Sequence, residues 1–178
     1  MNETALRYAH DLHQRLASLM PGAELSIERA AAYWRIRVPT APPTTFHFLL
    51  YVYDDAEVQI GVDLPGAPPN HSWYVPFERP DFPDDDARFE LFWTTVGRLL
   101  RSPVRFTSRR HRWLFCFEVT DVHLEMMLEG GWTHVQHPIE PSRGPNLNPR
   151  GRVVRVWTSS PWATGDPHRR EPGGDGPP

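Results

Sequence analysis

The stretch Thr44-Thr-Phe-His-Phe-Leu-Leu-Tyr-Val-Tyr53, followed by Asp54-Asp55 and by Ala56-Glu-Val-Gln-Ile-Gly-Val-Asp63, decides the fold class. Apolar side chains occupy every second position in both halves, which is the period of a strand with one buried face. The two aspartates between the halves predict a tight turn, although Asp enters the left-handed backbone region less readily than Gly. We therefore predict a β-hairpin of residues 44–53 against residues 56–63.

Two helices are predicted to flank this hairpin. The first begins after Asn2 and ends at Pro21, and its apolar residues recur at spacings of three and four. The second begins at three aspartates that suit the positive end of a helix dipole, and it ends before Pro103. The two apolar stripes are Leu6, Ala9, Leu12, Leu16 and Leu19, and Phe89, Phe92, Val96, Leu99 and Leu100. Asp121 is predicted to cap a short third helix that reaches Glu129.

Further strands are predicted around residues 25–27, 34–38, 104–108 and 111–119, with a basic turn at Arg109 and Arg110 between the last two. The element order is then α-β-β-β-β-α-β-β-α. Runs of strands set between helices favour an α+β fold over alternating β-α units. We expect an antiparallel sheet of about five or six strands with the helices packed on one face.

Composition changes near residue 137 and predicts a domain boundary there. Residues 138–178 contain nine of the 20 prolines and carry six Arg against four acids, whereas residues 1–137 carry 13 Arg against 18 acids. We predict a single α+β domain over 1–137 and a Pro/Gly-rich, largely disordered tail over 138–178. Residues 152–157 have strand composition inside this tail. They suit pairing with a sheet edge of the same domain or of a partner, or form a short patch without a role.

The composition also excludes several kinds of chemistry. The 178 residues include 19 arginines and no lysine, which excludes Schiff-base catalysis and the lysine of a phosphate-binding loop. The single cysteine, Cys116, excludes an internal disulfide and a zinc site with paired cysteines. The first residues lack the pattern of a signal peptide, and no apolar run approaches the length of a membrane span. We expect a cytoplasmic protein that needs no membrane and no cofactor.

Histidines and arginines suggest two alternative functions. His123, His134 and His137 are candidate ligands of an open metal site, as in a metal-dependent enzyme acting on a small molecule. The basic run at residues 109–112, beside Trp113, is of a type that binds nucleic acid. The acidic balance of residues 1–137 argues against nucleic acid as the partner.

The face of the hairpin that points away from the helices carries the main functional hypothesis. A sheet face open to water normally carries polar residues, but this one is rich in Tyr and Arg, which are enriched in protein interfaces. We predict a binding surface for another protein, formed with aromatic residues of the proline-rich stretch 64–83. Two alternatives remain open: this stretch covers the face, or the face forms a homodimer. The predicted contact residues are Tyr33, Arg35, Arg37, Tyr51, Trp73 and Tyr74.

The order of elements resembles that of small bacterial α+β proteins, namely type III secretion chaperones, the YbjN-like family and immunity proteins of toxin systems. The likeness lies in Trp73-Tyr-Val-Pro-Phe-Glu78, in the helix of residues 89–103 and in the strands of residues 104–119. It covers residues 3–129 at the level of element order, and no residue role is carried over. This resemblance implies a role in holding a client polypeptide or blocking a toxin rather than in catalysis.

Overall fold

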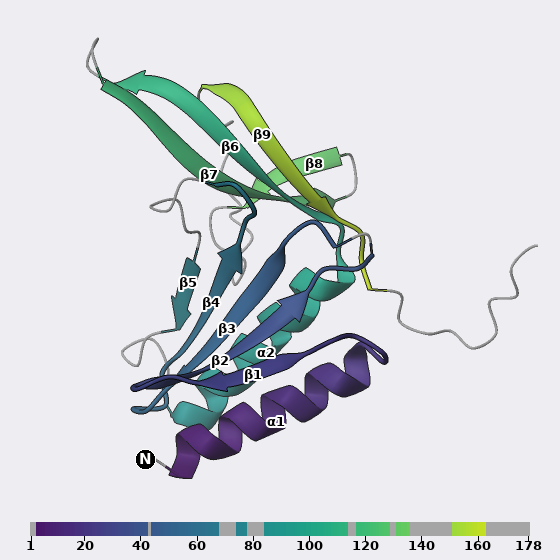
Figure 1. The fold of residues 1–178 in the computed structure, drawn as a ribbon, viewed down its shortest axis with the longest axis vertical. Coiled ribbons are helices and arrows are strands. Elements are labelled where there is room, and N and C mark those ends of the chain that lie inside the picture. The colour runs from purple at the N-terminus through teal and green to yellow at the C-terminus, as the bar shows by residue number, and fades with distance from the viewer. Residues whose placement is uncertain are drawn as a thin grey trace, which may run out of the picture.

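A computed structural model of the protein describes residues 3–42, 44–67, 74–77, 84–113, 117–128, 131–135 and 151–162. Its elements form an α+β fold, as predicted, but with two antiparallel sheets (Figure 1). The first sheet has the strand order β1-β2-β3-β4-β5, and the second has the order β8-β7-β6-β9. The elements are α1 (Glu3–Leu19), β1 (Ser26–Arg29), β2 (Tyr33–Pro39), β3 (His47–Tyr53), β4 (Val58–Asp63), β5 (Tyr74–Phe77), α2 (Asp85–Arg101), β6 (Val104–Trp113), β7 (Phe117–Leu128), β8 (Gly131–Val135) and β9 (Arg152–Ser159).

The predicted hairpin is formed by β3 and β4. Its loop contains one residue more than the two aspartates that were predicted to form the turn. The loop consists of residues 54–56, because the N–H of Tyr53 donates to the carbonyl of Glu57 at 2.8 Å. Ala56 takes the left-handed conformation with φ of 67°, the position that glycine normally fills in such a loop. The buried guanidinium of Arg88 donates to the Ala56 carbonyl at 2.6 Å, so α2 holds this loop in place.

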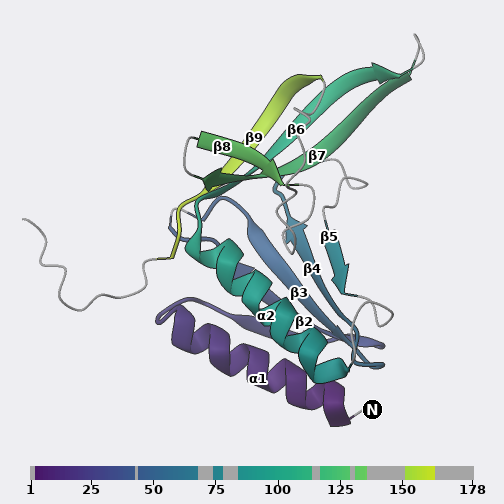
Figure 2. The same cartoon turned by 180° about the vertical axis from the view of Figure 1, so that it is seen from behind.

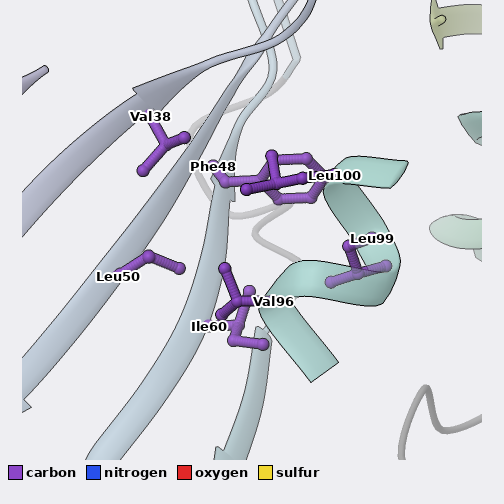
Figure 3. A pocket seen from close by; sticks show the side chains of 7 residues that line it. All are labelled: Val38, Phe48, Leu50, Ile60, Val96, Leu99 and Leu100. Carbon is purple, nitrogen blue, oxygen red and sulfur yellow. The ribbon is translucent and has the colours of Figure 1, made fainter. Parts of the chain in front are cut away.

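Both helices pack on the same face of the first sheet, and the main core lies between them and the sheet (Figure 2). Phe48, Leu50 and Ile60 of the sheet meet Val96, Leu99 and Leu100 of α2 in a wholly apolar contact (Figure 3). These side chains leave no room for a water molecule between them, so this region is packed core. Neither helix of the described residues is both long and apolar enough to cross a membrane.

The predicted third helix is wrong, because residues 117–128 form the long strand β7. Within it Leu124 and Met126, two residues apart, belong to the hydrophobic core, and Glu125 between them binds Arg105 of β6. The pairing of β7 with β6 on one side and β8 on the other outweighs the helix propensity of the local sequence. The predicted basic turn is also wrong, since Arg109 and Arg110 lie inside β6.

The strand β9 extends the domain beyond the predicted boundary at residue 137. It pairs with β6, so the pairing of this segment with its own domain is the alternative that the structure supports. Trp157 is 7% exposed, and its indole N–H donates to the Pro65 carbonyl at 3.2 Å. Trp162 donates to the Pro39 carbonyl at 3.1 Å. These two indoles attach β9 and the residues after it to β2 and to the loop that follows β4.

We predict that Trp157→Ala lowers the free energy of unfolding by about 3 kcal/mol, because it removes a large side chain from the junction of the two sheets. The matched control on the same strand is Val153→Ala, whose side chain is exposed and whose loss is expected to cost no more than about 0.5 kcal/mol. Urea unfolding followed by circular dichroism measures both. Equal effects of the two substitutions would contradict the placement of β9 in the domain.

Candidate functional site

The candidate site is the face of the first sheet opposite the helices, which we call the open face. It is formed by alternate residues of β2, β3 and β4, whose other residues point into the core. In Figure 1 the strands lie in front of α2, so that this face looks toward the viewer. Its members are partly or fully exposed apart from Gly61, and they are Tyr33, Arg35, Arg37, His47, Leu49, Tyr51, Tyr53, Gln59, Gly61 and Asp63.

Three tyrosines form the centre of the open face. The ring of Tyr33 meets that of Tyr51 edge-on at 5.4 Å between centroids and lies 5.6 Å from that of Tyr53. The hydroxyl of Tyr53 donates to the Gln59 side chain at 2.8 Å. Gly61 gives the Tyr51 ring its space, because a Cβ atom at residue 61 would lie 3.1 Å from that ring. The result is an aromatic platform held by contacts within the sheet.

The arginines of the open face are ion-paired with acids beside them. Arg35 binds Glu28 of β1, which stands opposite it in the strand register. Arg37 binds Asp63 of β4 across the central strand at 2.9 Å. The four side chains keep between 40 and 57% of their surface exposed, so each pair contributes little to stability. The open face therefore presents polar groups without a net charge from these residues.

Partial burial alters the titration of groups on this face. Burial raises the pKa of both Tyr51 and Tyr53, which remain neutral hydrogen-bond donors at physiological pH. Burial also lowers the pKa of His47, and the positive charge of Arg37 lowers it further, against a smaller opposing effect of Asp63. A guanidinium nitrogen of Arg37 lies 3.2 Å from Nδ1 of His47, a contact that suits a neutral imidazole. The face thus favours uncharged forms of its aromatic groups.

The structure brings together four of the six predicted contact residues: Tyr33, Arg35, Arg37 and Tyr51. The backbone of Tyr74 pairs with that of Gly61 at the edge of the same sheet, whereas Trp73 lies outside the described residues. Within the described part of the proline-rich stretch, β5 extends the sheet sideways and buries Val75 and Phe77 in the core. The alternative that the rest of that stretch covers the face falls on residues 68–73 and 78–83, which lie outside the described residues.

Sequence reasoning did not include the acidic partners Glu28 and Asp63 in the site. Both follow from strand register once the pairs β1–β2, β2–β3 and β3–β4 are aligned. Glu28 stands opposite Arg35, whereas Asp63 stands two residues along β4 from Gly61, the residue in line with Arg37 across β3, so this ion pair is diagonal. The signal was therefore present in the sequence but depended on a correct alignment of three strand pairs.

The alternative metal site is not assembled in the described part of the chain. Backbone pairing does place His134 opposite Glu125, on the same face of β7 as His123. Glu125 is 4% exposed and is bound by Arg105, so its charge is already neutralised. No group of three histidine, cysteine or acidic residues in the described ranges is placed to hold a metal ion, and His137 lies outside them.

A groove with a volume of about 460 Å³ lies between α1 and α2. Arg15 lies in it, bound by Asp11 and Glu90 and placed over the ring of Trp93. These contacts join the two helices, and they occupy the arginine with partners in its own chain.

Comparisons with protein-family models, curated proteins and solved structures give no match. The function is therefore argued from the geometry of the open face.

We predict that His47→Gln makes the protein lose less stability between pH 7.5 and pH 5 than the unchanged protein loses. The pKa of His47 is lowered in the folded state, so the unfolded chain binds a proton first as the pH falls below about 6.5. That proton uptake favours unfolding, and the substitution removes it. Urea unfolding of both proteins at the two pH values gives the comparison. An identical loss of stability in the two proteins would show that His47 is not held in its neutral form.

Proposed function

We propose that the protein is a non-enzymatic binding module that holds another protein against its open face, in the manner of a chaperone or an immunity protein. The observation that supports this proposal is the contacting set of Tyr33, Tyr51 and Tyr53 on a sheet face that the helices leave open. Tyrosine offers a large, rigid contact with a polar end and loses little conformational entropy on binding. Tyrosine and arginine are also the residue types that carry much of the binding energy in protein interfaces.

The ion pairs indicate what kind of protein surface fits. Arg35 and Arg37 are both neutralised by acids of the same sheet, so the open face attracts neither strongly acidic nor strongly basic partners. The tyrosine rings suit apolar side chains, and their hydroxyls suit backbone carbonyls. The partner that fits is therefore a polypeptide surface of mixed apolar and hydrogen-bonding character with little net charge, and its binding should depend weakly on salt. The single cysteine is in keeping with a reducing compartment, and we place this role in the cytoplasm.

Site-specific photocrosslinking in the native cell tests the proposal. A benzoylphenylalanine residue introduced in place of Tyr33 is expected to crosslink one partner protein, identified by mass spectrometry. The same probe in place of Ala17, an exposed residue of α1, is expected to leave that partner uncrosslinked. A crosslink from residue 33 to residues 68–73 or 78–83 of the same chain would show that the chain covers its own face. A crosslink between two copies would identify a homodimer instead.

Substitutions then measure the contribution of the tyrosines to binding of the purified partner. We predict that Tyr33→Ser and Tyr51→Ser each weaken the complex about 30-fold, which is about 2 kcal/mol and typical of a central interface residue. Trp93→Ser is the matched control, because it removes a partly buried aromatic side chain from α2, on the other side of the molecule. Titration calorimetry at two salt concentrations measures the three variants. Equal losses in all three would contradict the assignment of the open face.

A further inference from the structure

The strand β9 forms one edge of the second sheet and is unusually exposed. Among the described strands β6 alone pairs with it, so the opposite edge of its backbone faces no other strand. All five residues from 152 to 156 are exposed, although the Arg155 guanidinium donates to the Gly66 carbonyl and lies over the ring of Trp157. In Figure 1 this part of β9 runs beside the section of β6 that extends beyond the first sheet. A free edge of this kind can pair with an added strand.

The exposed residues of β9 are mainly apolar. Val153, Val154 and Val156 expose 40, 46 and 47% of their surface, and they are three of the four large hydrophobic residues most exposed in the described chain. Valine has a high preference for strands, so these residues favour the extended form that an added strand would pair with. Their clustering on one free edge indicates a contact surface, because single exposed apolar residues are otherwise scattered.

Charge on this sheet is segregated by strand. The strands β6 and β9 together contain six arginines and no acid, whereas the three acids of β7 lie on the far side of β6. Arg152 stands directly opposite Arg110 of β6. No carboxylate of the described residues forms an ion pair with Arg152 or Arg155. The edge formed by β9 is therefore positive, although the whole chain has a net charge of −3.

The same features disfavour pairing of β9 with a second copy of itself. Two such strands side by side would bring four guanidinium groups together with no carboxylate between them. The register with β6 also shifts between Ser108 and Arg109, which leaves Val154 without a partner in the pairing. An added strand of any sequence has to follow this bulge. The repulsion between the arginines is what favours a strand of different composition.

We propose that the free edge of β9 binds an extended, acidic segment of another protein by strand addition. Backbone hydrogen bonds would form along residues 152–156, a carboxylate would neutralise Arg152, and apolar side chains would cover the three valines. Nucleic acid is the other anionic partner to consider, but its phosphates leave exposed valines uncovered. This site lies on the second sheet and is independent of the open face of the first.

A synthetic peptide tests the proposal on the full-length protein. The probe is an end-capped peptide of alternating valine and glutamate, seven residues long, with a fluorophore on a flexible linker for anisotropy measurements. It is expected to bind, to bind at least tenfold more weakly to Arg152→Glu, and to weaken further as salt is raised. Arg101→Glu is the matched control, since it reverses an exposed arginine on α2 and is expected to leave the affinity unchanged. Hydrogen exchange should show protection of amides in residues 152–156.

Two altered peptides and one other probe make the result decisive. A peptide methylated at alternate backbone nitrogens cannot form the ladder, and a valine–lysine peptide has the wrong charge, so both are expected to bind at least tenfold more weakly. Tyr51→Ser should leave binding of the acidic peptide unchanged. The proposal is overturned if the acidic peptide does not bind, if either altered peptide binds equally well, or if protection appears on β2–β4 instead. A single-stranded oligothymidylate that displaces the peptide, or dimers of the free protein joined through β9, would also overturn it.

Discussion

The packing of Phe106 against Phe46 and Phe48 is the contact on which the arrangement of the molecule depends. Ring centroids lie 5.2 and 6.4 Å apart in these pairs, and they join two sheets that share no backbone ladder among the described strands. Trp157 and Trp162 add side-chain hydrogen bonds to the Pro65 carbonyl, in the loop after β4, and to the Pro39 carbonyl of β2. Because this junction lies at one end of the first sheet, the described strands of the second sheet do not cover the open face, and the far part of β6 and β9 extends beyond the core (Figure 1).

The central strand β3 alternates between residues of the core and residues of the open face. Leu50 and Val52 are fully buried against the helices, and the residues between and after them, Tyr51 and Tyr53, lie on the open face. The buried side chains supply the hydrophobic stabilisation of this strand. The outward side chains are not part of this core, so the binding role proposed for the three tyrosines places no demand on the packing of the helices.

Local periodicity was sufficient to predict the helices, the hairpin and the Tyr/Arg character of the open face, because each depends on alternation within a few residues. The features that failed depend on distant partners. Ala56 takes a left-handed conformation in contact with Arg88, 32 residues away in the sequence. Residues 121–129 have helix-forming composition, but pairing with β6 and β8 holds 121–128 extended. The partner of β9 lies more than 40 residues away, and composition alone left it undetermined.

Arginine serves three distinct purposes in this lysine-free chain. Its planar guanidinium lies over an indole ring where Arg105 meets Trp132 at 4.5 Å, a contact that a lysine ammonium makes less well. On the open face it is neutralised by neighbouring acids, whereas on β9 Arg152 forms no ion pair with an acid of the described residues. The two surfaces therefore differ in electrostatic character as well as in position. Under the two proposals made above, a neutral aromatic face and a positive strand edge would bind different partners, so the two polypeptide segments would not compete with each other.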